Sequence, residues 1–324
     1  MNAPKLPQPG LITAFSYGDG VGRIQLVDGT ELRVGSRNLT QVVSFDAEER
    51  PLVGVRVEVH EVAPHPLGGF RATNVTRLGK EVSFARVTSP SQWQKTLREA
   101  GLSEAHATQL RAAMRPAAQL SLKKGACRNG ASKIGGHPDV PSSFTWPTHE
   151  ETPLAFVAQV RLPDVPETVA ADLALPSQGL LSFFVGVDGE GAAVLHFAAR
   201  TRLSRMTPPL DALLEEHCVG VKEIWTPPDL ESADELFTGD TNAVRIYEAA
   251  WHDHQRARGD SPLHRVGGYA VPVQDSPEHD GERLLLQLDS DDAADLMWGD
   301  MGRLYFLFAP ARGFASARSE LQSG

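Results

Sequence analysis

The sequence contains very little cysteine. Cys127 and Cys218 are the only two, they stand far apart in the chain, and neither belongs to a CxxC pair or another metal-knuckle pattern. This excludes a cysteine-based zinc knuckle. We expect two reduced thiols, buried or half-buried. His217 precedes Cys218, but adjacent side chains rarely point at each other, so we assign neither cysteine a role.

The sequence also lacks the segments that lead a chain to or through a membrane. No apolar run approaches the roughly 18 residues that a membrane span needs. The first residues, MNAPKLPQPG, lack the basic-then-apolar pattern of a signal peptide. We therefore expect a cytoplasmic protein without a membrane partner.

Positive charge is in deficit as well. The chain has 31 Lys and Arg against 41 Asp and Glu, a net charge of −10, which argues against a dedicated binder of duplex DNA or of anionic membranes. Phosphate-binding GxxxxGK[ST], dinucleotide-binding and GxSxG patterns are absent too. We therefore expect no cofactor, and no positive case for an enzyme emerges from motifs.

What is present is typical of a folded protein with two domains. The 324 residues are 41% hydrophobic and 22% charged, and 29 Gly and 23 Pro predict many turns and short elements. We predict an α+β protein. A small barrel, residues 1–80, precedes a larger mixed α/β domain, residues 81–324.

Residues 10–78 have the pattern of a small all-β unit. Asp28-Gly29 separates two alternating runs and is the strongest hairpin signal in the chain, because Asp-Gly readily takes positive φ in a tight turn. About five strands at hairpin spacing predict a closed five-stranded barrel. The β-prone runs are Gly10–Ser16, Val21–Val27, Glu31–Val34, Gln41–Phe45, Val55–Glu61 and Gly69–Val75.

The runs GLITAF, GVGRI, DGTELRV, LVGVRVEV and FRATNV follow one another over roughly residues 9–77. This order resembles a cold-shock domain, a five-stranded OB-type barrel. In that family, aromatic side chains on the second and third strands stack on nucleobases. Here Gly20-Val21-Gly22-Arg23 replaces the glycine–aromatic run, and Leu32 and Val34 stand at the next aromatic places. With nine basic and eight acidic residues over 1–80, we expect a barrel whose nucleic-acid surface is lost.

Two amphipathic helices are expected after the barrel, as a hairpin over residues 89–116. Pro90 suits the first turn of one helix, which Gly101 ends. Ser103 suits the N-cap of the other helix, and Pro116 closes it.

The larger region contains an internal repeat. Each copy has a Gly-Gly turn, then an apolar strand that contains a glutamine, then a strand entered through glycine that carries aromatic residues. The first copy comprises Ile134–His137, Leu154–Val160 and Gly179–Phe184, and the second Val266–Tyr269, Leu284–Leu288 and Gly302–Phe308. We therefore predict two internally repeated β-rich halves that share or stack their sheets.

Short motifs mark the same stretches in order: SKIGGHP at 132–138, WP at 146–147, PLAFVAQ at 153–159, PSQGLLSFF at 176–184, GGYAVPVQ at 267–274, LQLDSD at 286–291 and WGDMG at 298–302. On these motifs, residues 125–316 resemble the YwqG-like family, a bacterial group of unknown function. Membership implies an α+β fold with repeated sheets and no agreed enzymatic activity. Some members of the family are encoded near secreted toxins, which implies immunity or inhibitory roles.

The glutamines of the repeat are candidate ligand contacts. Gln159 and Gln287 occupy matching places near the ends of apolar strands, where a glutamine usually satisfies backbone groups at a turn. Placed pseudo-symmetrically, the two could instead line a ligand or partner cleft between the halves. The other predicted members of this cleft are Lys133, His137, Trp146, Tyr269, Trp298 and Asp300.

A cluster of aspartates follows the second glutamine. Oxygen ligands that alternate along a loop can hold Ca²⁺ or Mg²⁺, and Asp289, Asp291 and Asp292 are the candidate metal ligands. Their spacing is not that of an EF-hand, however. Alternatively, Ser290 or Asp291 caps a helix over residues 292–298, whose first-turn carboxylates interact favourably with the helix dipole.

Three functions of different classes follow from these features. The leading hypothesis is a non-enzymatic module that binds a protein partner, with an immunity-like or regulatory role, and the acidic balance favours a basic partner. The second is an enzyme or small-ligand receptor with its site between the two halves. The third is single-stranded nucleic-acid binding by the barrel, which the missing aromatics make the least favoured.

Overall fold

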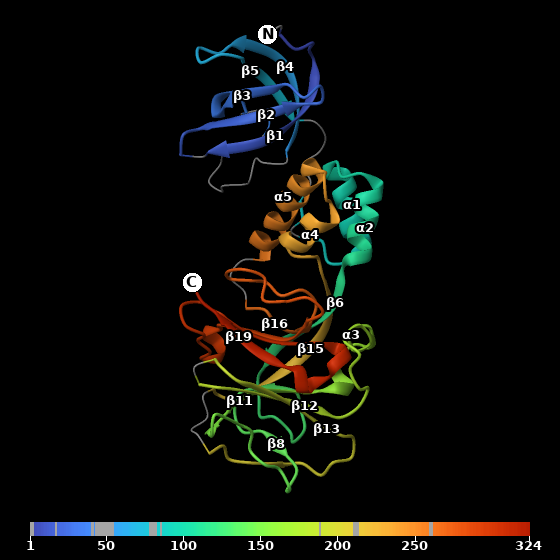
Figure 1. The fold of residues 1–324 in the computed structure, drawn as a ribbon, viewed down its shortest axis with the longest axis vertical. Coiled ribbons are helices and arrows are strands. Elements are labelled where there is room, and N and C mark those ends of the chain that lie inside the picture. Colours follow the sequence, from blue (N-terminus) through green and yellow to red (C-terminus); the bar gives the residue numbers. More distant parts are fainter. Residues whose placement is uncertain are drawn as a thin grey trace. The chain divides into compact units, whose positions relative to one another are not determined.

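The computed structural model of the chain divides into two compact units (Figure 1). One comprises Met1–Ala113 with Leu230–Gly259, and the other comprises Met114–Asp229 with Asp260–Gly324. The expected helical hairpin therefore groups by its packing with the first unit, and the predicted domain boundary after residue 80 stays a prediction. The structure describes residues 3–16, 18–39, 42, 55–77, 83–84, 86–187, 189–209, 214–258 and 262–324.

The first unit begins with a closed five-stranded barrel, as the sequence predicts. The strands, in the order β1-β2-β3-β5-β4 around the barrel, are β1 (Gln8–Ser16), β2 (Val21–Leu26), β3 (Glu31–Gly35), β4 (Arg56–Pro64) and β5 (Phe70–Arg77). Alternate side chains such as Ile12 and Ile24 fill its interior. Asp28-Gly29 forms the expected hairpin turn, with Gly29 at φ 84°. The expected strand Gln41–Phe45 lies mostly outside the described residues.

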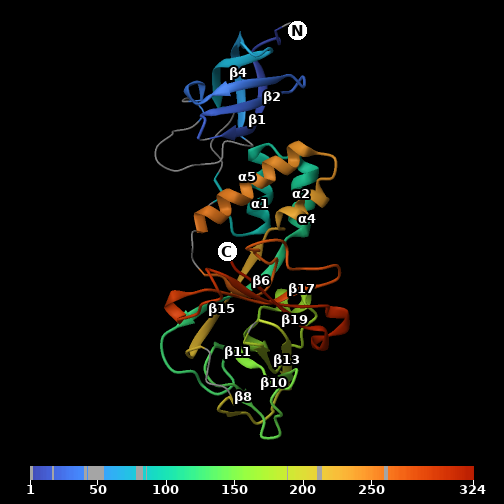
Figure 2. The same cartoon turned by 60° about the vertical axis from the view of Figure 1, so that its left-hand side comes forward.

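Four helices belong to the same unit: α1 (Pro90–Ala100), α2 (Glu104–Ala113), α4 (Leu230–Leu236) and α5 (Thr241–Arg258). Both helices of the expected hairpin are present. Ser89 and Gln92 form a capping box at the start of α1, and Gly101 ends it in the left-handed region. α2 ends before Pro116 because β6 already begins at Arg115. α1 contacts α5 and α2 contacts α4, so two hairpins distant in sequence pack together (Figure 2).

The second unit is built on one ten-stranded antiparallel sheet with the order β13-β12-β11-β7-β15-β6-β16-β17-β18-β19. Its strands are β6 (Arg115–Lys123), β7 (Lys133–Ile134), β11 (Ala155–Arg161), β12 (Leu180–Val185), β13 (Ala192–Phe197), β15 (His217–Thr226), β16 (His264–Gly267), β17 (Arg283–Asp289), β18 (Arg303–Phe308) and β19 (Arg318–Gln322). α3 (Glu167–Asp172) contacts β6. Two small sheets pair β8 (Asp139–Val140) with β14 (Ser204–Arg205), and β9 (Thr148–His149) with β10 (Thr152–Pro153).

The ten strands form the two repeated halves that the sequence predicts. Along the chain, β6, β7, β11, β12 and β13 recur as β15, β16, β17, β18 and β19. Within the sheet, the first strand of each half lies beside the second strand of the other, because β15 pairs with β7 and β6 pairs with β16. β6 and β15 also pair with each other at the centre. This strand exchange gives the two halves one sheet and one continuous apolar core.

Two sequence-based expectations need correction. The two cysteines are not free thiols: Cys127 and Cys218 form a disulfide with their Cα atoms 5.3 Å apart. The fold brings the segment after β6 against the start of β15, a proximity that sequence spacing does not encode. The helix expected over residues 292–298 is a single 3₁₀ turn, Asp292–Ala294, capped by Asp291 and ended by the left-handed Asp295. Within the described residues, no helix is long and apolar enough to cross a membrane.

Candidate functional site

The eight residues of the predicted cleft do not come together in the structure. Lys133 and Gln159 face each other across β7 and β11 in the first half, and Tyr269 lies near Gln287 in the second. Trp146, Trp298 and Asp300 lie apart from both groups. The indole N–H of Trp146 donates to the Leu154 carbonyl within an aromatic cluster, Trp298 packs partly buried on the apolar core, and Asp300 is exposed.

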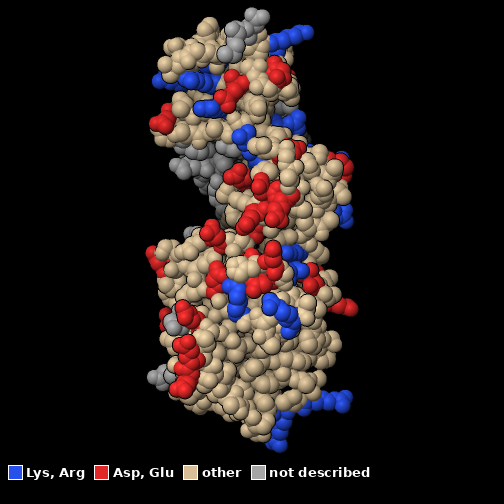
Figure 3. All heavy atoms as spheres, viewed as in Figure 1, with Lys and Arg blue, Asp and Glu red and all other residues tan. Residues whose placement is uncertain are grey.

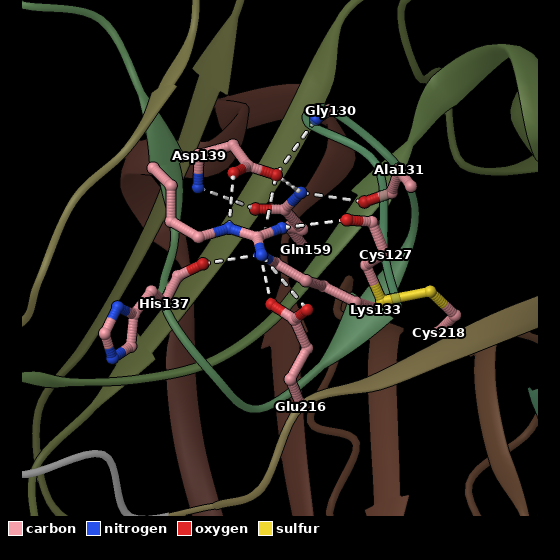
Figure 4. Close-up of a disulfide and its surroundings, with 10 residues drawn as sticks. Cys127, Gly130, Ala131, Lys133, His137, Asp139, Gln159, Glu216 and Cys218 are labelled. Carbon is pink, nitrogen blue, oxygen red and sulfur yellow. Dashed lines mark hydrogen bonds and ion pairs between the residues drawn. A yellow bond between two sulfur atoms is a disulfide. The ribbon is translucent and has the colours of Figure 1, made fainter. Parts of the chain in front are cut away.

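Lys133 is the centre of a buried ion cluster in the first half (Figure 4). Its side chain is fully buried, and its Nζ lies 3.0 Å from a Glu216 oxygen and 3.5 Å from an Asp139 oxygen. The same ammonium donates to the backbone carbonyl of His137, so His137 joins the cluster through its main chain. Arg205 adds a second cation, 3.4 Å from Asp139 and 3.2 Å from Glu216. Two cations and two carboxylates thus balance each other, with Lys133 and Asp139 fully buried and Arg205 and Glu216 partly exposed.

Gln159 ties this cluster to the neighbouring backbone. Its Nε2 donates to the Ala131 carbonyl at 2.7 Å and to Asp139 Oδ2 at 2.8 Å, while its Oε1 accepts the N–H of Asp139 at 3.0 Å. Two of these three bonds go to the fully buried Asp139, and the third goes to the half-buried Ala131. Gln159 therefore satisfies backbone and carboxylate groups that would otherwise be buried without partners.

The second half repeats this arrangement around Gln287. Its Nε2 donates to the Leu263 carbonyl at 3.3 Å and to Asp289 Oδ1 at 2.7 Å, and its Oε1 accepts the N–H of Val271 at 3.1 Å. Arg265 takes the place of Lys133 and donates to the carbonyl of Tyr269 and to Gln287. We call the two arrangements the first cradle (Lys133, Gln159) and the second cradle (Arg265, Gln287).

The cation, the glutamine and the backbone groups that they bond correspond between the two cradles, whereas the carboxylates, Asp139 and Asp289, come from different positions. The cation bonds the carbonyl four residues on, beyond a Gly-Gly turn, and the glutamine bonds the carbonyl two residues before the cation. A β-bulge precedes each glutamine. The Gly-Gly turn requires glycine: a Cβ on Gly135, at φ 67°, would lie 2.1 Å from the Glu215 carbonyl oxygen.

Burial decides what the cradles do. Lys133, Gln159 and Gln287 are fully buried, so none of them offers surface to a ligand in this conformation. Burial also raises the pKa of Tyr305, which lies opposite Gln287 in the sheet, and the hydroxyl donates to the Val271 carbonyl at 2.7 Å. Burial, assisted by Glu278 and Asp229, raises the pKa of Tyr269 as well, against the opposing effect of Arg115. The cradles are therefore closed internal braces.

The aspartates proposed as metal ligands have other partners. Asp289 accepts from the Leu263 N–H at 2.9 Å and lies 3.2 Å from Arg303, and Asp291 lies 3.1 Å from His264 Nε2. Asp292 is exposed at the start of the 3₁₀ turn. Among the residues that the structure describes, no group of three or more His, Cys, Asp or Glu side chains is placed to hold a metal ion.

An exposed row of arginines lies on the barrel. The strand register sets Arg23 on β2 opposite Arg33 on β3, and Arg33 beside Arg71 on β5, so three guanidinium groups share one face across three adjacent strands. All three side chains are exposed. We call the face that carries them the arginine face. It includes Phe15 of β1 and His65 of the β4–β5 loop.

The arginine face is hollowed. A groove of about 650 Å³ is lined by the three arginines together with Ala14, Phe15, Ser16, Val21, Gly22, Val34, Gly35, Asn38, His65 and Leu67. Val21 and Leu67 are 54% and 78% exposed, unusually high for large apolar side chains. Among the described residues that line the groove, none is acidic. The groove thus combines apolar surface with positive charge.

The structure places the residues on which the expectation of a lost nucleic-acid surface was based. Leu32 and Val34, taken as replacements for outward aromatic residues, point into the barrel, where they are 0% and 2% exposed. Arg33 between them points outward, since successive strand residues alternate between faces. The signal was therefore in the sequence: Arg23 and Arg33 occupy the exposed phase of two strands joined by the Asp28-Gly29 turn.

Comparison with known proteins bears on the second unit. Residues 132–312 match the family model described as a domain of unknown function, DUF1963. The chain belongs to the DUF1963 family. No curated protein matches the chain.

The DUF1963 segment contains both cradles and most of the ten-stranded sheet. The hairpin of α4 and α5 lies inside the matched range in sequence but packs with α1 and α2 of the first unit. The arginine face lies outside the segment, as does Cys127, whereas Cys218 lies inside it. The disulfide therefore joins the DUF1963 segment to the chain that precedes it.

Proposed function

We propose that the N-terminal barrel binds single-stranded nucleic acid in the groove of its arginine face. The observation that carries this proposal is the row Arg23–Arg33–Arg71, aligned across three strands on a hollowed surface. The missing aromatics make nucleic-acid binding the least favoured of the three functions, and we depart from that order because Arg23 on β2 and Arg33 on β3 lie opposite each other on the outside of the barrel.

Electrostatics argue for an anionic ligand. Like charges directly opposite each other in a sheet destabilise it. Arg23 has a partner in Glu31 at 2.9 Å, but the Nη1 of Arg33 lies 3.3 Å from His65 Nδ1, and an imidazole carries no negative charge. Figure 3 shows acidic side chains gathered over α4 and α5, whereas Lys and Arg are prominent on the barrel. The net charge of −10 is thus unevenly distributed and leaves this face positive.

The apolar part of the groove selects nucleic acid over an acidic peptide. A nucleotide presents a phosphate and a flat, largely apolar base within one short unit, and bases stack on aromatic rings and on guanidinium planes. Phe15, Val21 and Leu67 provide surface for bases next to the arginines. The position agrees with the fold, since OB-type barrels bind oligonucleotides on the face of strands 2 and 3 and the loop between strands 4 and 5.

Fluorescence anisotropy with the full chain tests this proposal. The probe is a labelled oligouridylate of about 12 nucleotides, within the site sizes of OB folds. We expect binding whose logarithm falls with the logarithm of salt concentration with a slope of about −1.4 to −2.1, the value for two or three phosphates on a single strand. The double variant Arg33→Ala/Arg71→Ala should weaken binding about tenfold or more.

The matched control is Arg37→Ala, an exposed arginine of the same barrel that does not line the groove. It should leave the affinity within about twofold, because screening limits the effect of a distant charge. Equal losses in both variants would show unspecific attraction, and absence of binding at low salt would refute the proposal. Stronger displacement of the probe by polyglutamate than by unlabelled oligouridylate would make the groove a peptide site instead.

For the DUF1963 segment, we keep as a proposal that it binds a protein partner in an immunity-like or regulatory role. The narrower assignment of the segment to the YwqG-like family, on the motifs quoted above, is also a proposal. Burial of Lys133, Gln159 and Gln287 supports a partner on the surface over a small ligand among these side chains. To test the protein-partner role, the full chain is isolated with the molecules bound to it, and the preparation is treated with nuclease. A stoichiometric protein should remain bound, and a solitary protein would count against the partner.

A further inference from the structure

The disulfide attaches a segment without helix or strand to the sheet. Cys127 lies between β6 and β7, in residues 124–132, and Cys218 lies at the start of β15. The Cα separation of 5.3 Å is within the usual range for a disulfide. These are the only cysteines of the chain, so the bond pairs the segment with β15 and with nothing else.

Three other attachments of this segment lead to the ion cluster around Lys133, whereas Ser132 at its end bonds to Asp164, Arg161 and Val219 outside the cluster. The Gly130 N–H donates to Asp139 at 2.9 Å, the Ala131 carbonyl accepts from Gln159 at 2.7 Å, and the Cys127 carbonyl accepts from Arg205 at 3.2 Å. If the segment moved away, these three bonds would break together. The position of the segment and the satisfaction of the cluster are therefore coupled.

The disulfide lies against this cluster. In the β7–β15 pairing, Cys218 is directly opposite Lys133, and opposed residues of two strands project to the same face (Figure 4). Cys127 is buried and Cys218 half-buried, so the bond is near the surface while Lys133 behind it is fully buried. The covalent bond thus fastens the segment whose backbone groups are hydrogen-bonded by the cluster.

The second cradle shows that such a bond is not required to bury a cation. The residue opposite Arg265 on the central strand is Gln119, at the place that Cys218 occupies opposite Lys133. Arg265 is nevertheless only 3% exposed. The disulfide is therefore an addition to the first cradle rather than a part of the repeated architecture.

We propose that Cys127–Cys218 is a reversible thiol–disulfide site that controls the exposure of the Lys133 cluster. The reactant is a dithiol. Its thiolate attacks one sulfur of the pair, a mixed disulfide forms, and the other cysteine leaves as a thiolate that takes up a proton. The second thiol of the reductant then displaces the first cysteine, so the protein gains two thiols and the reductant becomes a disulfide. Segment 124–132 then keeps its hydrogen bonds but loses its covalent bond to β15.

Hydrogen exchange of the full chain, oxidised and then reduced with dithiothreitol, tests the proposal. We expect exchange in peptides covering 124–137 to rise about tenfold or more on reduction, because local opening is controlled by the bond. The corresponding peptides of the second cradle, covering 263–271, should be unchanged. The site should also equilibrate with glutathione buffers, in which purely structural disulfides stay oxidised.

The double variant Cys127→Ser/Cys218→Ser is the matched control. Its exchange at 124–137 should equal that of the reduced protein and should not respond to dithiothreitol. Unchanged exchange on reduction of the wild-type chain would overturn the proposal. Exchange that rises equally in both cradles, or a bond that resists glutathione, would identify a structural brace instead.

Discussion

Two regions of this molecule gather cationic side chains, and they treat them in opposite ways. In the DUF1963 segment, Lys133 is fully buried and is held by Asp139 and Glu216. On the barrel, Arg33 and Arg71 are exposed side by side in a groove whose described lining contains no carboxylate. The buried cation has its counter-charges within the fold. The exposed ones leave room for counter-charges from another molecule.

The difference separates structural charge from functional charge. A buried charge is tolerated only with close partners, since removing it from water costs several kcal/mol. Its effects should therefore appear in stability. An exposed charge costs little and contributes little to folding, so its effects should appear in binding. Substitutions in the two regions can test this separation directly.

The largest effect is expected for Lys133→Met. Methionine keeps much of the volume but leaves Asp139, and in part Glu216, without the ammonium that balances them. Breaking a buried ion pair from one side typically costs about 3–5 kcal/mol. We expect that loss in the stability of the DUF1963 segment, measured by hydrogen exchange of amides in β7 and β11.

Lys95→Met is the matched control. The Lys95 side chain is 78% exposed on α1, and its ion pair with Glu99 is long, with 4.0 Å between Nζ and Oε1. It should change stability by less than about 0.5 kcal/mol. A comparable loss in both variants would contradict the structural role of Lys133. Retained oligonucleotide binding by Lys133→Met would support the separation of the two regions.

Much of this architecture could be predicted from the sequence because it depends on local signals. Asp28-Gly29 marks a barrel hairpin, and Ser89, Gln92 and Gly101 delimit α1 with a capping box and a left-handed glycine. The repeated Gly-Gly turns mark the two halves. Each of these features is set by backbone conformation within a few residues.

The two glutamines provide the next test. Gln159→Leu and Gln287→Leu each remove an amide that satisfies a backbone carbonyl, a backbone N–H and a carboxylate. Leaving buried polar groups without partners costs about 1–3 kcal/mol each, so we expect each variant to lose about 2–4 kcal/mol. Chemical denaturation and hydrogen exchange of β11 and β17 would measure both losses.

The two losses should agree within about 1 kcal/mol, because the bonding patterns correspond. Gln25→Leu, at an exposed barrel position, is the control and should be nearly neutral. A loss in one half only would show that the correspondence is geometric but not energetic, and the cradles would then have different roles.

What the sequence could not provide are contacts between distant segments. The glutamines were recognised as a matched pair, but Glu216 and Arg205, which complete the first cradle, come from loops and strands far along the chain. The disulfide was missed for the same reason. The arginine face was missed for another reason: Arg23 and Arg33 were visible, but their outward direction depends on which residues of β3 fill the barrel.

The smallest expected effect concerns the stability of the barrel. Arg33→Ser removes the central guanidinium of the row and with it the repulsion from Arg23 and Arg71, so it should stabilise the barrel by about 0.2–0.5 kcal/mol. Arg23→Ser also removes repulsion but loses the 2.9 Å pair with Glu31, so it should be neutral or slightly destabilising. Hydrogen exchange of buried amides in β2 and β3 of the full chain measures both. If Arg33→Ser instead destabilised the barrel by more than about 1 kcal/mol, the row would contribute to folding, and its claim to be a binding surface would be weakened. A surface kept for a ligand should gain stability and lose oligonucleotide binding when Arg33 is replaced. The fold does not need the mutually repelling arginines, so their presence is explained by an anion that they bind.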